Sequence, residues 1–327
     1  MDRLKKYTPL LFMLCLLIQS PILNAYVSSK KVLICGICRN IESSVPCLIK
    51  NMEALGKCFK DYRVIIYENN SEDNTVGLLT EWAEKNKNVV FVSEKLSEEM
   101  LSVSRTEKIA RARNKVLEIV RNGYTDYKYF INVDLDFRCV WPIKEIMKTM
   151  RSSQEWDCVA ANGLRGGDTY WDRYAYRSEK HPFGPELLGD EWWNKLSQTW
   201  FSLKEQQEWL PVYSAFGGLG IYKTATIIKF SYSGVVTPDL KKYYKRILRS
   251  LSKEDANRKE YLKLINWDNT ANIANVPIVF QYNTLNSSPP GYPYVSCCEH
   301  VSLHAAMAMH GFKKIYINPK MRMRYPE

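Results

Sequence analysis

The sequence alternates short apolar runs with segments whose apolar residues have helical spacing, and this alternation restricts the fold. The apolar runs 31–37, 63–67, 89–92 and 129–133 are rich in β-branched and aromatic residues, which is typical of β-strands. Between the first two runs, residues 44–59 carry apolar residues at helical spacing. Strands that alternate with helices form a largely parallel sheet flanked by helices. We therefore predict an α/β fold with a mainly parallel central sheet.

Polar residues follow three of these strands directly, at 38–42, 68–75 and 134–136. In such sheets, ligands bind beyond the carboxyl ends of the strands. We therefore expect the three segments to contribute to one binding site. The candidate ligand contacts in the first two segments are Cys38, Arg39, Asn40, Glu68, Asn69 and Asn70.

Two carboxylates, Asp134 and Asp136, end the fourth strand and are separated by one residue. In extended chain, such residues project to the same side. Two close carboxylates resist joint ionisation unless a cation lies between them, and their hard oxygens suit Mg²⁺ or Mn²⁺. An ordinary solvated turn explains the pair equally simply. The metal interpretation predicts a site that also holds a diphosphate.

The helix before this strand begins with a capping box, in which Ser104 is the N-cap residue and Glu107 lies three positions on. Arg105 and Arg113 fall on or beside its apolar stripe. Half-buried arginines need an anionic partner. That partner is either an internal carboxylate or a bound diphosphate.

Residues 162–206 are rich in glycine, tryptophan, tyrosine and charge. Aromatic side chains in polar loops suit stacking on sugars, although such a loop can also pack on itself. The glycine pair that follows at 217–218 allows close backbone approach to a ligand. It lacks the spacing of a dinucleotide-binding motif, which argues against a Rossmann dehydrogenase. The candidate acceptor contacts are Trp171, Asp172, Arg173, Gly217 and Gly218.

A late cluster contains Glu299, His300 and His304. At helical spacing the two histidines share one face. One of them can complete the coordination of the ion, and we take His304 as the third candidate metal ligand beside Asp134 and Asp136. Glu299 is a candidate general base or acceptor-orienting residue. Two ordinary helix-surface histidines are the alternative.

Residues 1–29 differ from the rest of the chain. Basic residues precede an apolar run at 9–18, and a short polar stretch then ends near Ala25. This is the order of a secretory signal peptide, and residues 8–27 can also serve as a signal-anchor. We predict a single domain at 30–327, in the secretory pathway or at a membrane.

The net charge of +11 favours an anionic partner such as a nucleotide, a phosphate or a membrane surface. No nucleic-acid-binding motif is present, so we expect no nucleic acid partner. The nine scattered cysteines do not predict a disulfide framework. Asn286 begins a glycosylation sequon if the domain is lumenal.

In their order, these motifs resemble those of a GT-A glycosyltransferase, and specifically the fungal capsule-associated α-1,3-mannosyltransferase family. The resemblance runs from about Val32 to Tyr325. This chain departs from the family at 216–218, where the fungal members tend to have Trp-Asn-Gly, and at His300, where they have cysteine. The matching motifs are Tyr67 to Thr75, Arg105 with Arg113-Asn114, Asp134 to Asp136, Asp168 to Arg173, Cys298 to His300 and Ile317 to Lys320.

The resemblance implies a GT-A fold and a nucleotide-sugar transferase with Mn²⁺ or Mg²⁺ at Asp134 and Asp136. GDP-mannose is the first expected donor, a UDP-sugar the next, and a glycan, glycolipid or protein is the expected acceptor. Glu68 and Asn69 match the segment that contacts the nucleoside. The expected catalytic residues are Asp136, Arg113 and Glu299. Arg113 and the ion would neutralise charge on the leaving diphosphate.

Two other classes remain open from the sequence. A nucleotidyltransferase acting on sugar phosphates also grips a nucleotide with paired carboxylates, but it normally has a glycine-rich basic loop after its first strand. A non-catalytic carbohydrate-binding protein on the same fold is the other. Release of pyrophosphate would identify the first, and sugar binding without turnover the second.

Overall fold

The computed structural model describes residues 27–137, 140–189, 192, 202–204, 208–251 and 291–325. The described strands are β1 (Lys31–Cys38), β2 (Asp61–Asn69), β3 (Val89–Glu94), β4 (Tyr129–Val133), β5 (Cys158–Leu164), β6 (Leu210–Pro211), β7 (Leu219–Lys223) and β8 (Ile315–Arg324). The described helices are η1 (Glu42–Ser44), α2 (Val45–Gly56), α3 (Thr75–Lys85), α4 (Glu98–Leu101), α5 (Arg105–Gly123), α6 (Ile143–Arg151), α7 (Pro185–Leu188), α9 (Thr224–Ile227), α10 (Pro238–Ser250) and α12 (Glu299–Met309).

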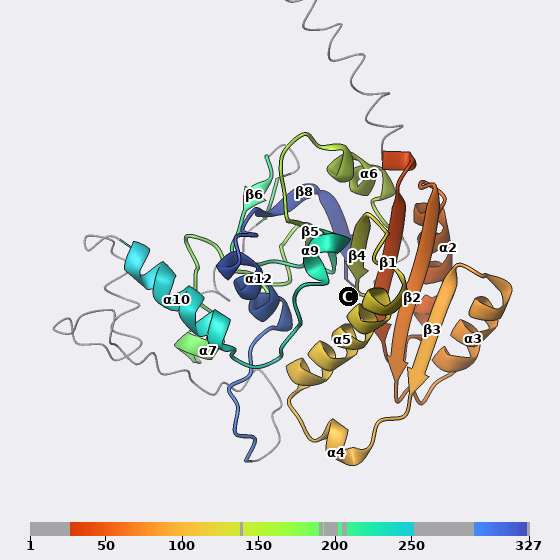
Figure 1. The fold of residues 1–327 in the computed structure, drawn as a ribbon, viewed down its shortest axis with the longest axis horizontal. Helices are drawn as coiled ribbons and strands as arrows, with labels where there is room; N and C mark the ends of the chain where they lie inside the picture. The colour runs from red at the N-terminus through yellow and green to blue at the C-terminus, as the bar shows by residue number, and fades with distance from the viewer. Residues whose placement is uncertain are drawn as a thin grey trace, which may run out of the picture.

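All of these strands belong to one eight-stranded sheet in the order β3-β2-β1-β4-β7-β5-β8-β6 (Figure 1). Strands β3, β2, β1 and β4 are mutually parallel, as are β5 and β8. Strand β7 runs antiparallel to both of its neighbours, β4 and β5, and β6 runs antiparallel to β8. The prediction of an α/β fold with a mainly parallel sheet is confirmed.

Helices cover both faces of the sheet because alternate strand residues point to opposite sides. On β1, Val32 and Ile34 pack into the core beneath α2, α3 and α6. Leu33 and Cys35 pack into the second core, beneath α5 and α12. A third cluster joins α7, α10 and α12. The polar ends of β1 and β4 therefore lie at the edge of a sheet that is covered by helices on both faces.

Local signals in the sequence place the element boundaries well. Strands β1 to β4 cover the four predicted strands. Helix α5 begins after Ser104, whose hydroxyl oxygen accepts a hydrogen bond from the Glu107 backbone N–H at 3.3 Å. The glutamate does not complete the capping box, since its carboxylate accepts from the Gly234 N–H instead.

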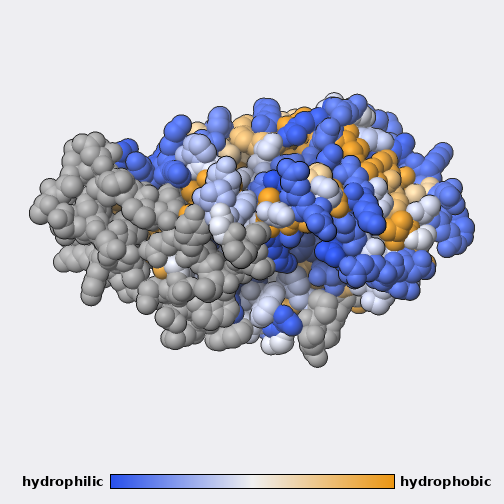
Figure 2. All heavy atoms as spheres, turned by 90° about the horizontal axis from the view of Figure 1, so that it is seen from below, coloured by the Kyte–Doolittle hydropathy of each residue, from blue (hydrophilic) through white to orange (hydrophobic). Residues whose placement is uncertain are grey.

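Two expectations fall outside the described residues: the leader up to residue 26 and the sequon at Asn286. Among the helices described, none is both long and apolar enough to cross a bilayer. The described surface seen in Figure 2 is mostly hydrophilic, with apolar residues interspersed.

One of the described cysteines takes part in a disulfide. Cys47, in α2, is disulfide-bonded. The other described cysteines are free thiols: Cys35, Cys38, Cys58, Cys158, Cys297 and Cys298.

Candidate functional site

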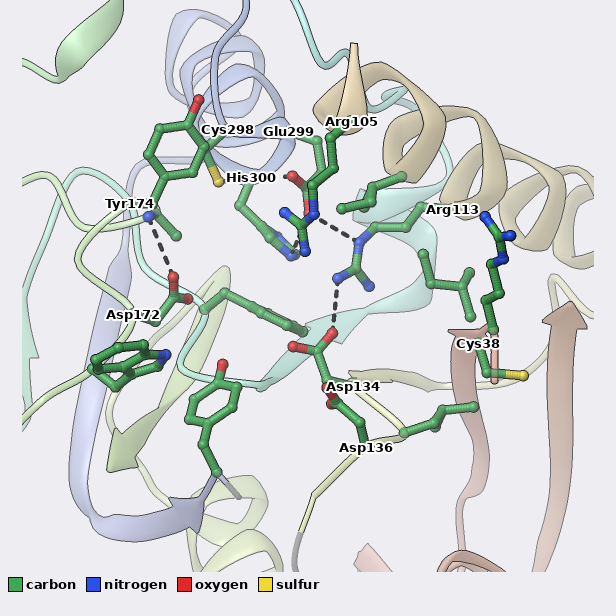
Figure 3. A pocket seen from close by; sticks show the side chains of 18 of the residues that line it. Cys38, Arg105, Arg113, Asp134, Asp136, Asp172, Tyr174, Cys298, Glu299 and His300 are labelled. Carbon is green, nitrogen blue, oxygen red and sulfur yellow. Dashed lines mark hydrogen bonds and ion pairs between the residues drawn. The ribbon is translucent and has the colours of Figure 1, made fainter. Parts of the chain in front are cut away.

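A pocket of about 620 Å³ lies where β1 and β4 end. This volume is in the range of small-molecule sites. Its wall comes from the loop after β1, the first turns of α5, the segment after β4, the loop after β5 and the start of α12 (Figure 3). Two of the three predicted polar segments, 38–42 and 134–136, meet here. The pocket is the candidate functional site.

Asp134 and Asp136 both line the pocket. The Asp134 backbone N–H donates to the Gly218 carbonyl at 2.9 Å, which fixes the residue at the end of β4. Its side chain is 27% exposed, whereas Asp136 is exposed. Burial raises the pKa of Asp134 to about 7; Arg113 opposes this rise and the charge of Asp136 adds to it. A carboxylate in these surroundings gains from a nearby cation.

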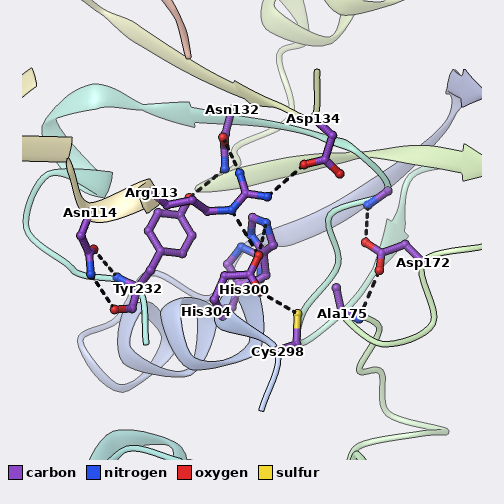
Figure 4. A network of polar contacts seen from close by, with 12 residues as sticks. Arg113, Asn114, Asn132, Asp134, Asp172, Ala175, Tyr232, Cys298, His300 and His304 are labelled. Carbon is purple, nitrogen blue, oxygen red and sulfur yellow. Dashed lines mark hydrogen bonds and ion pairs between the residues drawn. The ribbon is translucent and has the colours of Figure 1, made fainter. Parts of the chain in front are cut away.

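Arg113 lies at the centre of a buried polar network (Figure 4). Its Nη2 donates to Asp134 at 3.0 Å, its Nη1 to the Asn132 side chain at 2.9 Å and its Nε to Glu299 at 3.1 Å. Burial acts against its charge, but Asp134 and Glu299 outweigh burial and raise the pKa of Arg113. Of the two partners open from the sequence, the internal carboxylate is the one observed.

The first turn of α12 brings Glu299 and His300 into the pocket wall. The Glu299 carboxylate is buried between Arg113 and the Cys298 thiol, which lies 3.8 Å away. His300 is 1% exposed and stacks on Phe216 with ring centroids 3.9 Å apart. Its Nε2 lies 3.5 Å from the Glu299 carboxylate, and neither ring nitrogen has a hydrogen bond to a described residue.

His304 does not fit the predicted role of third metal ligand. It is fully buried, and it is absent from the described lining of the pocket. Its Nδ1 is bonded to the Ser214 hydroxyl at 2.9 Å and its Nε2 to the Tyr222 hydroxyl at 3.0 Å. Both ring nitrogens are thus occupied within the core. We leave His304 out of the site.

The segment 68–75 packs against the loop after β1, and its candidate residues lie outside the pocket wall. The buried Glu68 carboxylate accepts hydrogen bonds from the Ser71 N–H at 2.6 Å and the Ser93 hydroxyl at 2.5 Å, so it shapes its own loop. None of the candidates Glu68, Asn69 and Asn70 is part of the described lining. Their predicted contact with a ligand stays a prediction.

By contrast, Cys38, Arg39 and Asn40 do line the pocket. Asn40 adopts a left-handed φ of 53°, and its side chain accepts from the Glu72 N–H at 2.8 Å. Arg39 donates to the Asn70 carbonyl at 3.1 Å. The loop 68–75 therefore holds the loop after β1 in place.

On the opposite side, the pocket is lined by Trp171 and Asp172, two of the candidate acceptor contacts. The Asp172 carboxylate accepts from the Gly217 N–H at 2.9 Å and from the Ala175 N–H at 3.4 Å. Burial raises the pKa of Asp172. The Arg165 guanidinium lies over the Trp171 ring, 4.4 Å from its centroid.

The other predicted acceptor contacts lie behind this wall. Arg173, Gly217 and Gly218 are buried and are not part of the described lining. Both glycines have positive φ, and a Cβ on Gly218 would lie 1.7 Å from the Phe137 ring. The glycine pair thus forms a tight turn that orients Asp172 and Asp134.

Asp134 and Asp136 fit a divalent ion by the chemistry of their oxygens. Asp134 gives one oxygen to Arg113, and Asp136 is exposed to the pocket. Within the described part of the chain, no group of three or more His, Cys, Asp or Glu side chains is arranged to hold a metal. The remaining positions around an ion would fall to water and to a ligand, as is usual for Mg²⁺.

The sequence of this chain has only distant similarity to those of known proteins. No protein family and no curated protein matches the sequence. Solved structures of similar fold include a mycobacterial protein (TM-score 0.43, 12% identity, covering 93% of this chain and 69% of that one). Another is TarS 1–349 of S. aureus (TM-score 0.39, 11% identity, covering 72% of this chain and 70% of that one). A third is the mannosyltransferase PcManGT of Pyrobaculum calidifontis, solved with GDP-Man and Mn²⁺ (TM-score 0.36, 14% identity, covering 72% of this chain and 69% of that one). These similarities are too low to decide the activity of this chain.

Proposed function

We propose that the chain is a metal-dependent glycosyltransferase of the GT-A type that transfers a sugar from a nucleotide-diphosphate donor. The observation that carries this proposal is the pair Asp134 and Asp136 in a pocket at the end of β4, with the exposed arginines Arg39 and Arg105 in the same wall. Carboxylates that hold an ion, with arginines around them, suit a diphosphate.

Each side of the pocket has a chemical role in this proposal. When bound, the ion at Asp134 and Asp136 would supply positive charge against the leaving diphosphate. Arg105 would bind phosphate oxygens, since it lines the pocket without an ion pair to any described residue. Arg113 would stabilise the developing charge from its fixed place beside Asp134.

The acceptor would bind at the opposite wall. Trp171 offers an aromatic face to a sugar, and Asp172 is held by two backbone donors and can accept a hydrogen bond from a hydroxyl. Glu299 lies deeper, paired with Arg113, where it would orient groups near the reacting carbon. The acceptor class that fits these groups is a glycan or glycoconjugate.

Mannose from GDP-mannose is the first donor to test, because the ordered motifs resemble those of the fungal capsule-associated mannosyltransferases. The assay incubates the full chain with GDP- and UDP-sugars and Mn²⁺, and measures release of nucleoside diphosphate. We expect turnover with one donor, its loss in EDTA and in Asp136→Ala, and its retention in Asp126→Asn, an exposed control.

Two outcomes would contradict the proposal. The first is no turnover with any donor. The second is turnover that persists in EDTA or in Asp136→Ala. Release of pyrophosphate instead of nucleoside diphosphate would identify a nucleotidyltransferase.

We also propose a place in the secretory pathway, through a cleaved or anchoring leader. The disulfide at Cys47 supports this, because disulfides persist in oxidising compartments. Expression with the native leader tests it: a glycosidase-sensitive mass shift that disappears in Asn286→Gln is expected. An unshifted chain with a free Cys47 thiol would refute it.

A further inference from the structure

Arg113 is committed to the protein on all three of its nitrogens. It bonds to Asp134, Asn132 and Glu299, which belong to the end of β4, to β4 itself and to α12. Only 5% of its side chain is exposed. Its guanidinium carbon also lies 4.9 Å from the Phe216 ring centroid. Gripping a phosphate would require this arginine to leave a complete set of partners.

Breaking such a set is costly. A buried pair that loses one partner leaves a charge uncompensated in a poorly solvated site. Arg105 offers the simpler phosphate contact, because it is exposed on the same wall and has no ion pair to a described residue. Arg113 therefore keeps its three hydrogen-bond partners, and Arg105 contacts the phosphate.

The position of Arg113 has a consequence for the ion. Its positive charge lies one hydrogen bond, 3.0 Å, from the Asp134 oxygen. A unit charge so close to a metal ligand weakens cation binding about tenfold or more, even with the screening of water. Glu299 shares the guanidinium and offsets part of this charge, but among the described residues no third metal ligand is grouped with Asp134 and Asp136 to restore the affinity.

We propose that Arg113 is a positioning residue and an internal counter-cation, which fixes Asp134 against Glu299 and keeps the affinity of the empty site for a divalent ion low. The ion is then held tightly only together with a diphosphate, whose negative charge compensates Arg113. The last step rests on the proposed function, since it takes the ligand to be a nucleoside diphosphate.

The test is titration of the full-length chain with Mn²⁺ alone, followed by calorimetry or electron paramagnetic resonance. Arg113→Met is expected to bind Mn²⁺ about tenfold or more tightly than the wild type. Arg113→Lys keeps the charge and should stay within about threefold. Arg111→Met removes an exposed arginine of the same helix, outside the pocket, and should leave the affinity unchanged. Asp136→Asn should abolish the binding in every background.

The direction of the effect separates this role from a merely structural one. If Arg113 only held the fold together, Arg113→Met would disorder Asp134 and weaken Mn²⁺ binding. Equal or weaker binding by a folded Arg113→Met, checked by circular dichroism, would overturn the proposal.

A second variant guards against loss of folding. Glu299→Gln removes the carboxylate that shares Arg113, so more of the guanidinium charge acts on Asp134. Mn²⁺ binding should then weaken by about threefold or more. Unchanged or tighter binding in this variant would also overturn the proposal.

The nucleotide adds a further measurement. In the wild type, GDP should strengthen Mn²⁺ binding, because the diphosphate charge compensates Arg113 and two ligands that favour each other do so reciprocally. This gain should shrink in Arg113→Met, which has no guanidinium charge left to compensate. An equal gain in both would contradict the proposal. Failure of every donor in the turnover assay, with the Mn²⁺ results as expected, would reject the proposed function and leave the role of Arg113 standing.

Discussion

The buried imidazole of His304 makes the stability of the fold depend on pH. The ring is fully buried between the Ser214 and Tyr222 hydroxyls, and burial lowers its pKa from an ordinary 6.5 to about 3. In the unfolded chain the ring regains its ordinary pKa. As the pH falls, the unfolded state therefore binds this proton first.

The sign and size of the effect follow from proton linkage. Since the folded-state pKa is depressed, the contribution of His304 is complete above pH 6.5 and is lost as the pH falls towards 3. Each pKa unit corresponds to about 1.4 kcal/mol, so the full shift is worth about 5 kcal/mol. At pH 5 the loss from this one ring is about 2 kcal/mol.

Urea unfolding at pH 7.5 and pH 5.0 tests this, with wild type compared with His304→Gln. Glutamine retains one donor and one acceptor but does not titrate. We expect the variant to be less stable at pH 7.5, and its deficit to shrink by about 2 kcal/mol at pH 5.0.

The control is His310→Gln, at the exposed end of α12, which should leave the pH dependence as in the wild type. If the deficit of His304→Gln is the same at both pH values, the buried imidazole is not the source of the acid sensitivity.

Three further predictions concern single positions. Gly218→Ala should lower stability by about 3 kcal/mol in urea unfolding, because φ is positive and the new Cβ would overlap Phe137; a smaller loss than Gly123→Ala would contradict this. Arg177→Met should cost about 3–5 kcal/mol in the same assay, because the buried Glu186 carboxylate would lose its cation and keep only the hydrogen bond from the Tyr244 hydroxyl among its described partners. Trp171→Ala should raise the acceptor KM about tenfold at unchanged donor KM, measured by initial rates; an equal rise in both would argue against acceptor stacking.

Local patterns in the sequence predict much of this fold. The run at 129–133 is a strand buried at every position, and the aspartates follow it as expected. Ser104 marks the start of α5 by a contact three residues away. Such signals need no knowledge of distant partners, which is why they can be interpreted from one sequence.

Local patterns do not distinguish the roles of two side chains of the same type in similar local positions. His300 and His304 lie one turn apart, and helical spacing treats them alike. Ser214 and Tyr222, about 80 to 90 positions away, occupy the nitrogens of His304, while His300 remains in the pocket wall. The sequence predicts Glu68 as a ligand contact, whereas in the structure its carboxylate accepts a hydrogen bond from the Ser93 hydroxyl of the neighbouring strand and supports its own loop.

The glycine turn explains why the donor and acceptor sides of the proposed site lie where they do. It precedes β7, the strand that reverses the direction of the sheet beside β4. The Gly217 N–H holds Asp172, and the Gly218 carbonyl receives the Asp134 N–H. Two adjacent peptide groups thus fix the distance between the candidate acceptor carboxylate and the candidate metal ligand. Side chains at 217 and 218 would push this turn away from Ala161 and Phe137, so glycine here serves to align the two halves of the site rather than to contact a sugar.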